Sequence, residues 1–457
     1  MSALSWSVRT LGRALDGETV YRELLAGEQV AFWLDGSLTD RLPHRVSVLG
    51  TTLGDSAEVV VRDVADGDVF AELDALLAAR STEPPTELTG LFCGGYVGYF
   101  GYELKALTGG AAAHESPTPD ALWIWANRFV VIDHDRDRTY LVAVDAPGAG
   151  EGWLDRAEKA AADWWMASVD VPAVARLDLE AHLEQHRSAY LAGIARCMAA
   201  LEAGESYEIC LTNRVRLPAV PDPFEFFRWQ RSANPAPYAA FLRYGDLAVA
   251  SSSPERFLTV DADGWAECRP IKGTAPRELD AAQDELAAKA LAEDEKTRAE
   301  NLMIVDLIRN DLSRVSEPGT VQVPQLMQVE TYRSVHQLVT TVRGRLRSGV
   351  SAVDAVRACF PPGSMTGAPK IRTMEILDEL ELSARGVYSG ALGYLTVDGR
   401  ADLSVVIRTA VLTPDQTVIG AGGAIVLDSE PVAEYDEMVL KATAAVGGDA
   451  AAEGWGR

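Results

Sequence analysis

Short segments that alternate apolar and polar residues recur along the first third of the chain, and they constrain its fold more strongly than any other feature. Such alternation is typical of half-buried β-strands. It occurs in QVAFWLDGS (29–37), HRVSVLG (44–50), AEVVVRDV (57–64) and RFVVIDHDRDRTYLVAV (128–144). In the last of these, DHDRD predicts the turn of a hairpin. The N-terminal part of the chain is therefore predicted to be largely sheet.

From about residue 185, segments with a helical spacing of apolar residues alternate with further strand-like segments. The predicted helices lie in HRSAYLAGIARCMAALEAG (186–204) and in the long stretch 279–312. The predicted strands include SGALGYLTV (389–397), SVVIRTAVLT (404–413) and QTVIGAGGAIV (416–426). Because several of these strands follow one another through short turns, an antiparallel α+β fold is favoured over a doubly wound parallel sheet.

Breaks that contain glycine and proline divide the chain. Residues 146–172 begin with a glycine-rich break, continue as a predicted helix and end in a second break at Val171 and Pro172. We therefore predict a strand-rich N-terminal domain over residues 1–170 and a second domain over residues 175–446. The last residues, GGDAAAEGWGR (447–457), are predicted to form a flexible tail.

The composition argues against several classes of protein. Of the 457 residues, 47% are hydrophobic, which is ample for a substantial core. The formal charge of −25, from 67 acidic and 42 basic residues, argues against a nucleic-acid or anionic-membrane surface. The five cysteines form no CxxC pair, so neither a disulfide framework nor a zinc site is indicated. The N-terminus carries charges too early for a signal peptide, and no run approaches the roughly 18 apolar residues of a membrane span, so a cytoplasmic location is expected.

One lysine occupies an unusual position in PIKGTAPR (270–277). Pro270 and Pro276 bracket this segment and Gly273 loosens it, which predicts a tight turn at the end of a strand. Lys272 then has two interpretations. In the first, the stem of the side chain packs on the protein and the ammonium reaches water. In the second, burial lowers the pKa of Lys272 until the free amine can act as nucleophile or base.

Two acidic segments could bind a cation. In RAENLMIVDLIRND, helical spacing turns Glu300 toward the apolar face, unless its side chain bends out to water. In AEYDEMVLKA, Glu434, Glu437 and Lys441 share one helical face, which also fits a solvated ion pair between Glu437 and Lys441. Two or three carboxylates with few other ligands would suit Mg²⁺, which completes its shell with water and an anionic substrate.

Three further features could hold an anion. GSMTGAPKIRTMEIL (363–377) places small residues and Pro369 before a helix whose N-terminus could face a carboxylate. IGAGGAIV (419–426) allows close approach to its backbone because of its glycines. Arg408 lies inside an otherwise apolar predicted strand, so it must pair either with a substrate carboxylate or with a structural acid.

Seven motifs, taken in order, resemble those of the chorismate-utilising enzymes. They are SPERF (253–257), PIKGTAPR, RAENLMIVDLIRND, GSMTGAPK, GYL with DLSVVIRTA, GAGGAIVLDSEP, and EYDE. The resemblance covers about residues 185–446 and, more weakly, the N-terminal half. It implies an α+β fold of two intertwined lobes, with two facing antiparallel sheets, outer helices and an active site between the sheets. PIKGT is similar to the branch that aminates chorismate at C4, because the branches that form anthranilate and isochorismate carry alanine in place of Lys272.

This resemblance implies covalent catalysis. The Lys272 amine would attack C2 of chorismate while the C4 hydroxyl leaves, and ammonia would then add at C4 as the lysine departs. Glu255 corresponds to the residue proposed as general acid/base for the departing hydroxyl, although SPERF alone also fits an ion pair between Glu255 and Arg256.

The resemblance also implies ligands for a metal and for the substrate. It assigns Glu300 and Glu437 to direct contact with Mg²⁺ and Glu434 to contact through water. Tyr388 and Arg408 would hold the enolpyruvyl carboxylate, helped by nearby backbone N–H groups. The full set of implied substrate-binding residues is Gly273, Thr274, Tyr388, Arg408, Gly423, Ala424 and Lys441.

The chain departs from the family pattern at three positions. Thr297 stands where an acidic residue usually precedes the first metal-binding glutamate, so metal affinity could be lower. Ala424 replaces a glycine, which narrows the approach to its backbone. Gln337 stands where anthranilate synthases carry histidine, and the neighbouring His336 is expected to be a core or surface residue rather than a catalytic one.

Ammonia in this family normally comes from glutamine through a separate class I amidotransferase subunit. No GxCxGxQ nucleophile motif occurs in the chain, so we expect such a partner to bind it and expect the chain alone to use free ammonium.

Two alternatives to this function stay open. One is an anthranilate synthase component I or another chorismate enzyme. The other is a non-catalytic subunit that binds chorismate or tryptophan, although Gly36 in AFWLDGS interrupts the usual pattern of a tryptophan site.

Overall fold

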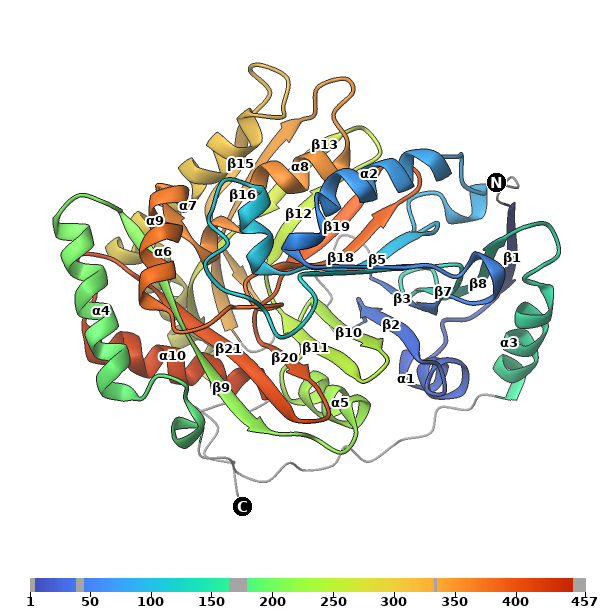
Figure 1. Ribbon diagram of the computed structural model, residues 1–457, viewed down its shortest axis with the longest axis horizontal. Helices are drawn as coiled ribbons and strands as arrows, with labels where there is room; N and C mark the ends of the chain where they lie inside the picture. Colours follow the sequence, from blue (N-terminus) through green and yellow to red (C-terminus); the bar gives the residue numbers. More distant parts are fainter. Residues whose placement is uncertain (1–4, 38–44, 164–178, 333–334, 447–457) are drawn as a thin grey trace.

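Two large antiparallel sheets form the body of the protein. The computed structural model describes residues 5–37, 45–163, 179–332 and 335–446. Within these ranges one sheet has eleven strands and the other has ten, and helices lie on the outside (Figure 1). The α+β fold with two antiparallel sheets, predicted from the sequence, is confirmed. No helix among the described residues is long and apolar enough to cross a membrane.

The eleven-stranded sheet combines strands from both halves of the chain. Its strands, in spatial order, are β1 (Ser5–Leu11), β8 (Arg138–Asp145), β7 (Arg128–Asp133), β3 (Val46–Thr51), β2 (Val30–Asp35), β10 (Tyr238–Tyr244), β11 (Leu247–Ser253), β20 (Thr409–Leu412), β21 (Gln416–Ile425), β9 (Glu208–Pro218) and β17 (Gly367–Ala368). The pairing of β2 with β10 joins the N-terminal strands to the rest of this sheet.

The ten-stranded sheet also combines strands from both halves of the chain. Its strands, in spatial order, are β14 (Ile271–Pro276), β16 (Val335–Arg345), β13 (Trp265–Arg269), β12 (Arg256–Val260), β19 (Ala401–Val405), β18 (Ala391–Thr396), β5 (Gly95–Phe100), β6 (Ala121–Trp125) and β4 (Val59–Arg62), with β15 (Gln322–Thr331) also paired to β16. In Figure 1 the blue and cyan N-terminal strands lie beside green, yellow and orange strands in both sheets. The predicted boundary near residues 170–175 and the predicted tail at 447–457 lie outside the described residues.

Strand β7 shows how one sheet is buried on both faces. Phe129 and Val131 belong to the apolar cluster that also contains residues of the ten-stranded sheet, such as Trp123. Val130 and Ile132 belong to a second cluster, which includes residues of the outer helices. Since successive side chains of a strand point to opposite faces, one face of the large sheet packs on the other sheet and its opposite face packs on helices.

The helices cover the two sheets on the outside (Figure 1). They are α1 (Gly17–Val20), α2 (Val69–Arg80), α3 (Glu151–Asp163), α4 (Arg187–Glu202), α5 (Pro223–Ala233), α6 (Ala281–Glu293), α7 (Glu295–Ser313), α8 (Ala352–Cys359), α9 (Lys370–Leu380) and α10 (Pro431–Ala445). The single helical stretch predicted over residues 279–312 is therefore two helices. Asp294 separates them, because it ends α6 and caps α7 by accepting a 2.7 Å hydrogen bond from the N–H of Thr297.

The strand predicted over residues 404–413 is also divided. Its first part belongs to β19 in the ten-stranded sheet and its second part is β20 in the eleven-stranded sheet. Arg408 lies between them with a φ of +50°, so it is not inside a strand as the apolar pattern predicted. The chain crosses from one sheet to the other at this residue.

Candidate active site

Lys272 lies on β14, within a strand rather than on the tight turn expected from its flanking prolines. The next residue, Gly273, has a φ of +81°, and the pairing of β14 with β16 shifts register between Ile271 and Thr274. A Cβ at Gly273 would lie 2.4 Å from Cγ2 of Thr297, so glycine is required both by its backbone angle and by the available space. This irregularity packs the backbone beside Lys272 against the first turn of α7.

The Lys272 side chain connects the two sheets. It is buried, and its Nζ donates a hydrogen bond to Oε1 of Glu208, the fully buried first residue of β9 in the opposite sheet. Burial alone would lower the pKa of Lys272, but the negative charges of Glu208 and Glu300 outweigh it and hold this pKa above its usual value. In the resting protein Lys272 is therefore a paired ammonium, rather than the free amine that one interpretation of the sequence required.

Glu255 lies at a second crossing between the sheets, between β11 and β12. Burial raises its pKa to about 7, although a hydrogen bond from Ser364 and the charge of Lys272 oppose this shift. Arg256 pairs with Glu267 at 3.0 Å instead, so the ion pair that SPERF alone suggested between Glu255 and Arg256 is absent among the described contacts. A carboxyl with this pKa, close to Lys272, can donate and accept a proton near neutral pH.

Three carboxylates and one lysine lie between α7 and α10. The Nζ of Lys296 lies 2.8 Å from Oε1 of Glu434 and 3.8 Å from Oε1 of Glu300. Glu434 also accepts a 2.6 Å hydrogen bond from the Ser429 hydroxyl. Burial, with the charges of Glu208 and Glu434, raises the pKa of Glu300 to about 7, although Lys272 and Lys296 oppose this shift. The third carboxylate, Glu437, is half exposed and pairs with Lys441 at 2.7 Å, as its helical spacing allowed.

These carboxylates fit a divalent cation by their chemistry. They are the oxygen donors that Mg²⁺ prefers, and Lys296 shows that Glu300 and Glu434 can reach one positive charge. Within the part of the chain that the structure describes, however, no three acidic, histidine or cysteine side chains converge closely enough to hold a metal ion. The fit is therefore one of donor chemistry alone, and in this structure Lys296 is the cation that Glu300 and Glu434 share.

Arg408 is available to bind an anion. Burial lowers its pKa, and no carboxylate counters this shift. Among the described residues no acidic side chain forms an ion pair with Arg408, so the structural salt bridge considered from the sequence is not observed. The ring of Tyr388 is buried and packs on Gly420, where a Cβ would lie 2.2 Å from the ring. Burial raises the pKa of Tyr388, so its hydroxyl stays a neutral hydrogen-bond donor.

The glycine-rich strand β21 borders the same region. β20 pairs with β21 only as far as Ile419, whereas β9 pairs with it up to Ile425. Alternate N–H groups beyond Ile419 therefore face away from β9, along an edge that β20 does not occupy. A Cβ at Gly423 would lie 3.4 Å from Oε2 of Glu434, which brings this strand close to the carboxylates. The neighbouring Ala424 pairs with Cys210 of β9.

Two of the implied substrate-binding residues lie at the margin of this region. Nζ of Lys441 lies 3.2 Å from the carbonyl oxygen of Gly422, in addition to its ion pair with Glu437. Thr274 is exposed and pairs in the ladder with Gln337. Thr274 is therefore two positions from Lys272 on β14, and Lys441 contacts the glycine-rich strand at Gly422.

Comparison with known proteins agrees with this arrangement. A family model described as chorismate binding enzyme matches residues 38–447. The chain belongs to the chorismate-binding enzyme family. It is 45% identical over 465 residues to an aminodeoxychorismate synthase of Streptomyces pristinaespiralis, a match that covers 95% of this chain and 64% of that protein. It is 41% identical over 357 residues to aminodeoxychorismate synthase component 1 of Klebsiella aerogenes, with 77% of this chain and 76% of that protein covered.

A solved structure also supports the fold. Anthranilate synthase component I from Streptococcus pneumoniae TIGR4 superimposes with a TM-score of 0.73 at 28% identity, over 94% of this chain and 97% of that chain. The family resemblance and the fold that the sequence motifs implied are therefore confirmed. The chain spans 64% of the length of the S. pristinaespiralis protein and 63% of that of a Streptomyces griseus relative.

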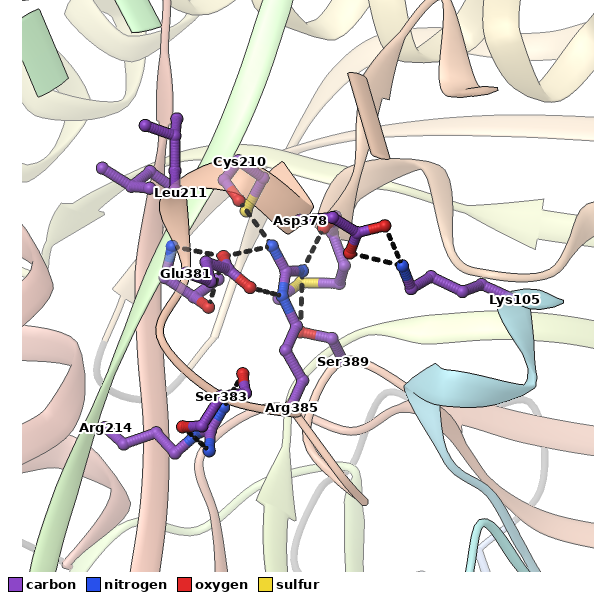
Figure 2. A network of polar contacts seen from close by, with 12 residues as sticks. Lys105, Cys210, Leu211, Arg214, Asp378, Glu381, Ser383, Arg385 and Ser389 are labelled. Carbon is purple, nitrogen blue, oxygen red and sulfur yellow. Dashed lines mark hydrogen bonds and ion pairs between the residues drawn. The ribbon is translucent and has the colours of Figure 1, made fainter. Parts of the chain in front are cut away.

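A buried arginine, which the motifs did not single out, connects the segments of this chorismate-binding fold. Figure 2 shows Arg385 in an ion pair with Glu381, to which it donates two hydrogen bonds of 2.7 and 2.8 Å. Its remaining donors reach the carbonyl oxygens of Met365 (2.6 Å) and Cys210 (2.9 Å) and the hydroxyl of Ser389 (3.3 Å).

These three acceptors adjoin residues of the site. Cys210 is two residues from Glu208, Met365 follows Ser364, and Ser389 follows Tyr388. Arg385 thus joins, at one point, three segments that carry residues of the candidate site. The Glu381 carboxylate extends the network to β9, since it accepts hydrogen bonds from the N–H (3.1 Å) and the hydroxyl (2.8 Å) of Thr212.

Thr297 and His336, which were noted where the chain departs from the family pattern, both make structural contacts. Thr297, which replaces an acidic residue, packs its methyl group against Gly273 beside Lys272. His336 is buried, with Nε2 at 2.9 Å from Asp284 and Nδ1 at 2.9 Å from the hydroxyl of Thr331. These contacts support the expected structural role of His336.

A separate cavity of about 190 Å³ lies next to Gly36. It lies between β2, β10 and β18 and is lined by side chains that include Asp35, Tyr238 and Arg256. A Cβ at Gly36 would lie 2.3 Å from the carbonyl oxygen of Val46, which explains the glycine. None of the residues proposed for catalysis lines this cavity.

Proposed function

We propose that the chain aminates chorismate at C4 and forms 4-amino-4-deoxychorismate, the activity named for its aminodeoxychorismate synthase relatives. The observation that carries this proposal is the position of Lys272. Lys272 is buried between the two sheets, paired with one carboxylate and close to a second. The reaction needs an amine at the reacting carbon, and Lys272 can supply it.

The mechanism begins with proton transfer, because Lys272 rests as an ammonium. Glu208 is the carboxylate in contact with Nζ, so it is the acceptor for the proton that must leave before attack. The free amine adds to C2 of chorismate, the ring double bonds shift, and the C4–O bond breaks. Glu255 in its protonated form supplies the proton with which the hydroxyl leaves as water.

The second half reverses these steps. Ammonia attacks C4, the double bonds shift back, and the bond between C2 and the lysine nitrogen breaks. Glu255 takes the proton that the new amine loses, and Lys272 recovers its proton from Glu208. Protons and electrons then balance over the cycle, with chorismate and ammonia consumed and water released.

Substrate orientation follows from the anion-binding groups. Arg408 and Tyr388, with the N–H groups of β21, would hold the enolpyruvyl carboxylate. Glu300, Glu434 and Glu437 would hold Mg²⁺, which supplies a positive charge for the ring carboxylate. Lys441 would contribute a further cation at the open side of the site.

We propose in addition that a class I glutamine amidotransferase supplies the ammonia. The relatives named component 1 support a second component. The purified chain is therefore expected to release no glutamate from glutamine, while it uses ammonium salts directly. Glutamate release, measured with glutamate dehydrogenase in the absence of any partner, would contradict this part of the proposal.

The free cysteines, all buried, support a reducing compartment such as the cytoplasm.

Product analysis tests the proposed reaction. The purified chain is incubated with chorismate, Mg²⁺ and ammonium, and the products are followed by mass spectrometry with and without an aminodeoxychorismate lyase. The proposal predicts a product that retains the enolpyruvyl group and gives p-aminobenzoate only when the lyase is added. Fluorescent anthranilate and pyruvate formed without the lyase would instead indicate an anthranilate synthase. No turnover with any nitrogen source would favour the non-catalytic chorismate- or tryptophan-binding subunit.

The pH dependence of the reaction tests the role of Glu255. Since the pKa of Glu255 in the free protein is about 7, the fraction of the protonated acid falls as pH rises through 7, and kcat/KM is expected to fall with it. Glu255→Gln should lose this alkaline limb and lower kcat by roughly 10²- to 10⁴-fold. Glu267→Gln is the matched control, because Glu267 is a neighbouring acid that pairs with Arg256. An unchanged pH profile in Glu255→Gln would contradict the assignment.

A further inference from the structure

The segment GSMTGAPK, which the sequence singled out as a possible anion holder, begins with a short helical turn over Gly363–Met365. The chain that leads into this turn is fixed by Lys370. Its Nζ donates hydrogen bonds to the carbonyl oxygens of Cys359 (2.8 Å) and Pro361 (2.9 Å). The charge of Lys370 is balanced by Asp311 at 2.6 Å, so these contacts belong to the resting protein.

The chain that leaves the turn is fixed as well. Arg385 donates a 2.6 Å hydrogen bond to the carbonyl oxygen of Met365. The carbonyl oxygen of the next residue, Thr366, accepts a 2.9 Å hydrogen bond from the N–H of Cys210 on β9. Ser364 is half-buried and lies between these two anchored parts of the backbone, so its position is set by contacts on both sides.

The Ser364 hydroxyl donates a hydrogen bond to the buried carboxyl of Glu255. Burial raises the pKa of Glu255 to about 7, and of the groups that oppose this shift Ser364 has the largest effect. The other groups that face Glu255 are the ammonium groups of Lys272 and Lys441 and the N–H of Ile271. The acceptor that this segment contacts is therefore a carboxyl of the protein itself.

Ser364 differs chemically from the other neighbours of Glu255. An ammonium or a backbone N–H can only donate a hydrogen bond, so it favours the carboxylate form alone. A hydroxyl can donate to a carboxylate and accept from a carboxylic acid. Ser364 can therefore keep its contact with Glu255 in both protonation states, which an acid that later acts as a base requires.

We propose that Ser364 is a positioning residue, which holds the Glu255 carboxyl in one orientation through both proton transfers of the amination. This inference rests on the proposed function, because it takes Glu255 as the acid and base. It gives the GSMTGAPK segment a role, since Lys370 and Arg385 fix the backbone on either side of Ser364.

The pH profile of kcat/KM with ammonium is the first readout. Loss of a hydrogen bond that favours the carboxylate raises the pKa of Glu255, so Ser364→Ala should move the alkaline limb up by about one pH unit. The maximum should fall roughly 10-fold, because the carboxyl is less well oriented. Ser364→Thr keeps the hydroxyl and should retain both values. Ser383→Ala is the matched control, since the Ser383 hydroxyl donates to Glu184 (2.8 Å) outside the candidate site.

An infrared titration of the free protein is the second readout. The carboxyl band that disappears in Glu255→Gln is followed against pH in the unsubstituted chain and in Ser364→Ala. Its midpoint should lie near pH 7 and should rise in Ser364→Ala, but not in Ser383→Ala. In addition, Ser364→Ala should cost little further rate when it is combined with Glu255→Gln, because Ser364 acts through Glu255.

Three outcomes overturn the inference. An unchanged infrared midpoint in Ser364→Ala, in a chain that aminates chorismate, would overturn the role of Ser364 alone. A loss of rate that Ser364→Thr does not recover, or one that multiplies with that of Glu255→Gln, would mean that Ser364 does not act through Glu255. Failure of the unsubstituted chain to aminate chorismate would overturn the proposed function and this role together, whatever the infrared midpoints.

Discussion

Removal of the Lys272 amine is expected to abolish chorismate amination. Without this nucleophile the covalent route is closed, and the rate should fall by roughly 10³-fold or more. A single substitution is not sufficient evidence, however. Lys272→Ala leaves the fully buried Glu208 without its partner, and such a loss destabilises a protein by about 3–5 kcal/mol. Loss of activity in this variant could then reflect misfolding.

The double substitution Lys272→Met with Glu208→Gln separates the two effects. It removes both charges and preserves approximate volume, so most of the stability should return while activity stays absent. The measurements are kcat with ammonium and the midpoint of urea unfolding. A folded double variant that aminates chorismate at the rate of the unsubstituted chain would show that Lys272 is not the nucleophile.

Substitution of Arg385 should have the largest effect on stability outside the lysine site. Arg385→Met leaves Glu381 buried and unpaired and removes the donors to the carbonyl oxygens of Met365 and Cys210. We expect a loss of about 3–5 kcal/mol, measured as a lower urea midpoint. Arg385→Lys should be nearly as damaging, because an ammonium cannot reproduce the planar fork that contacts Glu381 and both carbonyls.

An exposed arginine provides the control for this prediction. Arg309 pairs with Asp306 at 3.1 Å on the surface of α7, and Arg309→Met should change stability by less than about 1 kcal/mol. If Arg385→Met were equally mild, the network in Figure 2 would not be what holds the three segments together.

Elements defined by local pattern were the ones that the sequence predicted well. Short apolar segments located β2, β3, β4, β7 and β8, but the expectation that they are half-buried was wrong for β7 and β8, because one sheet face packs on the other sheet and the opposite face packs on helices. The stretch over residues 404–413 shows the limit. Apolar residues continue through this stretch, but the chain passes from one sheet to the other at Arg408. Because both sheets are buried, the apolar pattern does not show to which sheet each residue belongs.

The site residues that the sequence identified also lie in local motifs, and those that it missed depend on distant partners. Lys272 and Glu255 could be selected because they lie in local motifs that resemble those of the family, although the partner of Lys272 lies 64 positions away. Glu208, Lys296 and Arg385 could not, because their importance comes from partners 64, 138 and 175 positions away along the chain. Glu208 left one signal that could have been used, since it is a charged residue directly before the apolar run ICL (209–211).

The most direct test of covalent catalysis is the mass of the protein itself. The chain is mixed with chorismate while ammonium is withheld, quenched in acid, and analysed by intact-protein and peptide mass spectrometry. The mechanism predicts an increase equal to chorismate less one water, located on the peptide that contains Lys272 and absent from Lys272→Met with Glu208→Gln. An active chain that showed no such adduct, or carried it on a different residue, would contradict the role of Lys272.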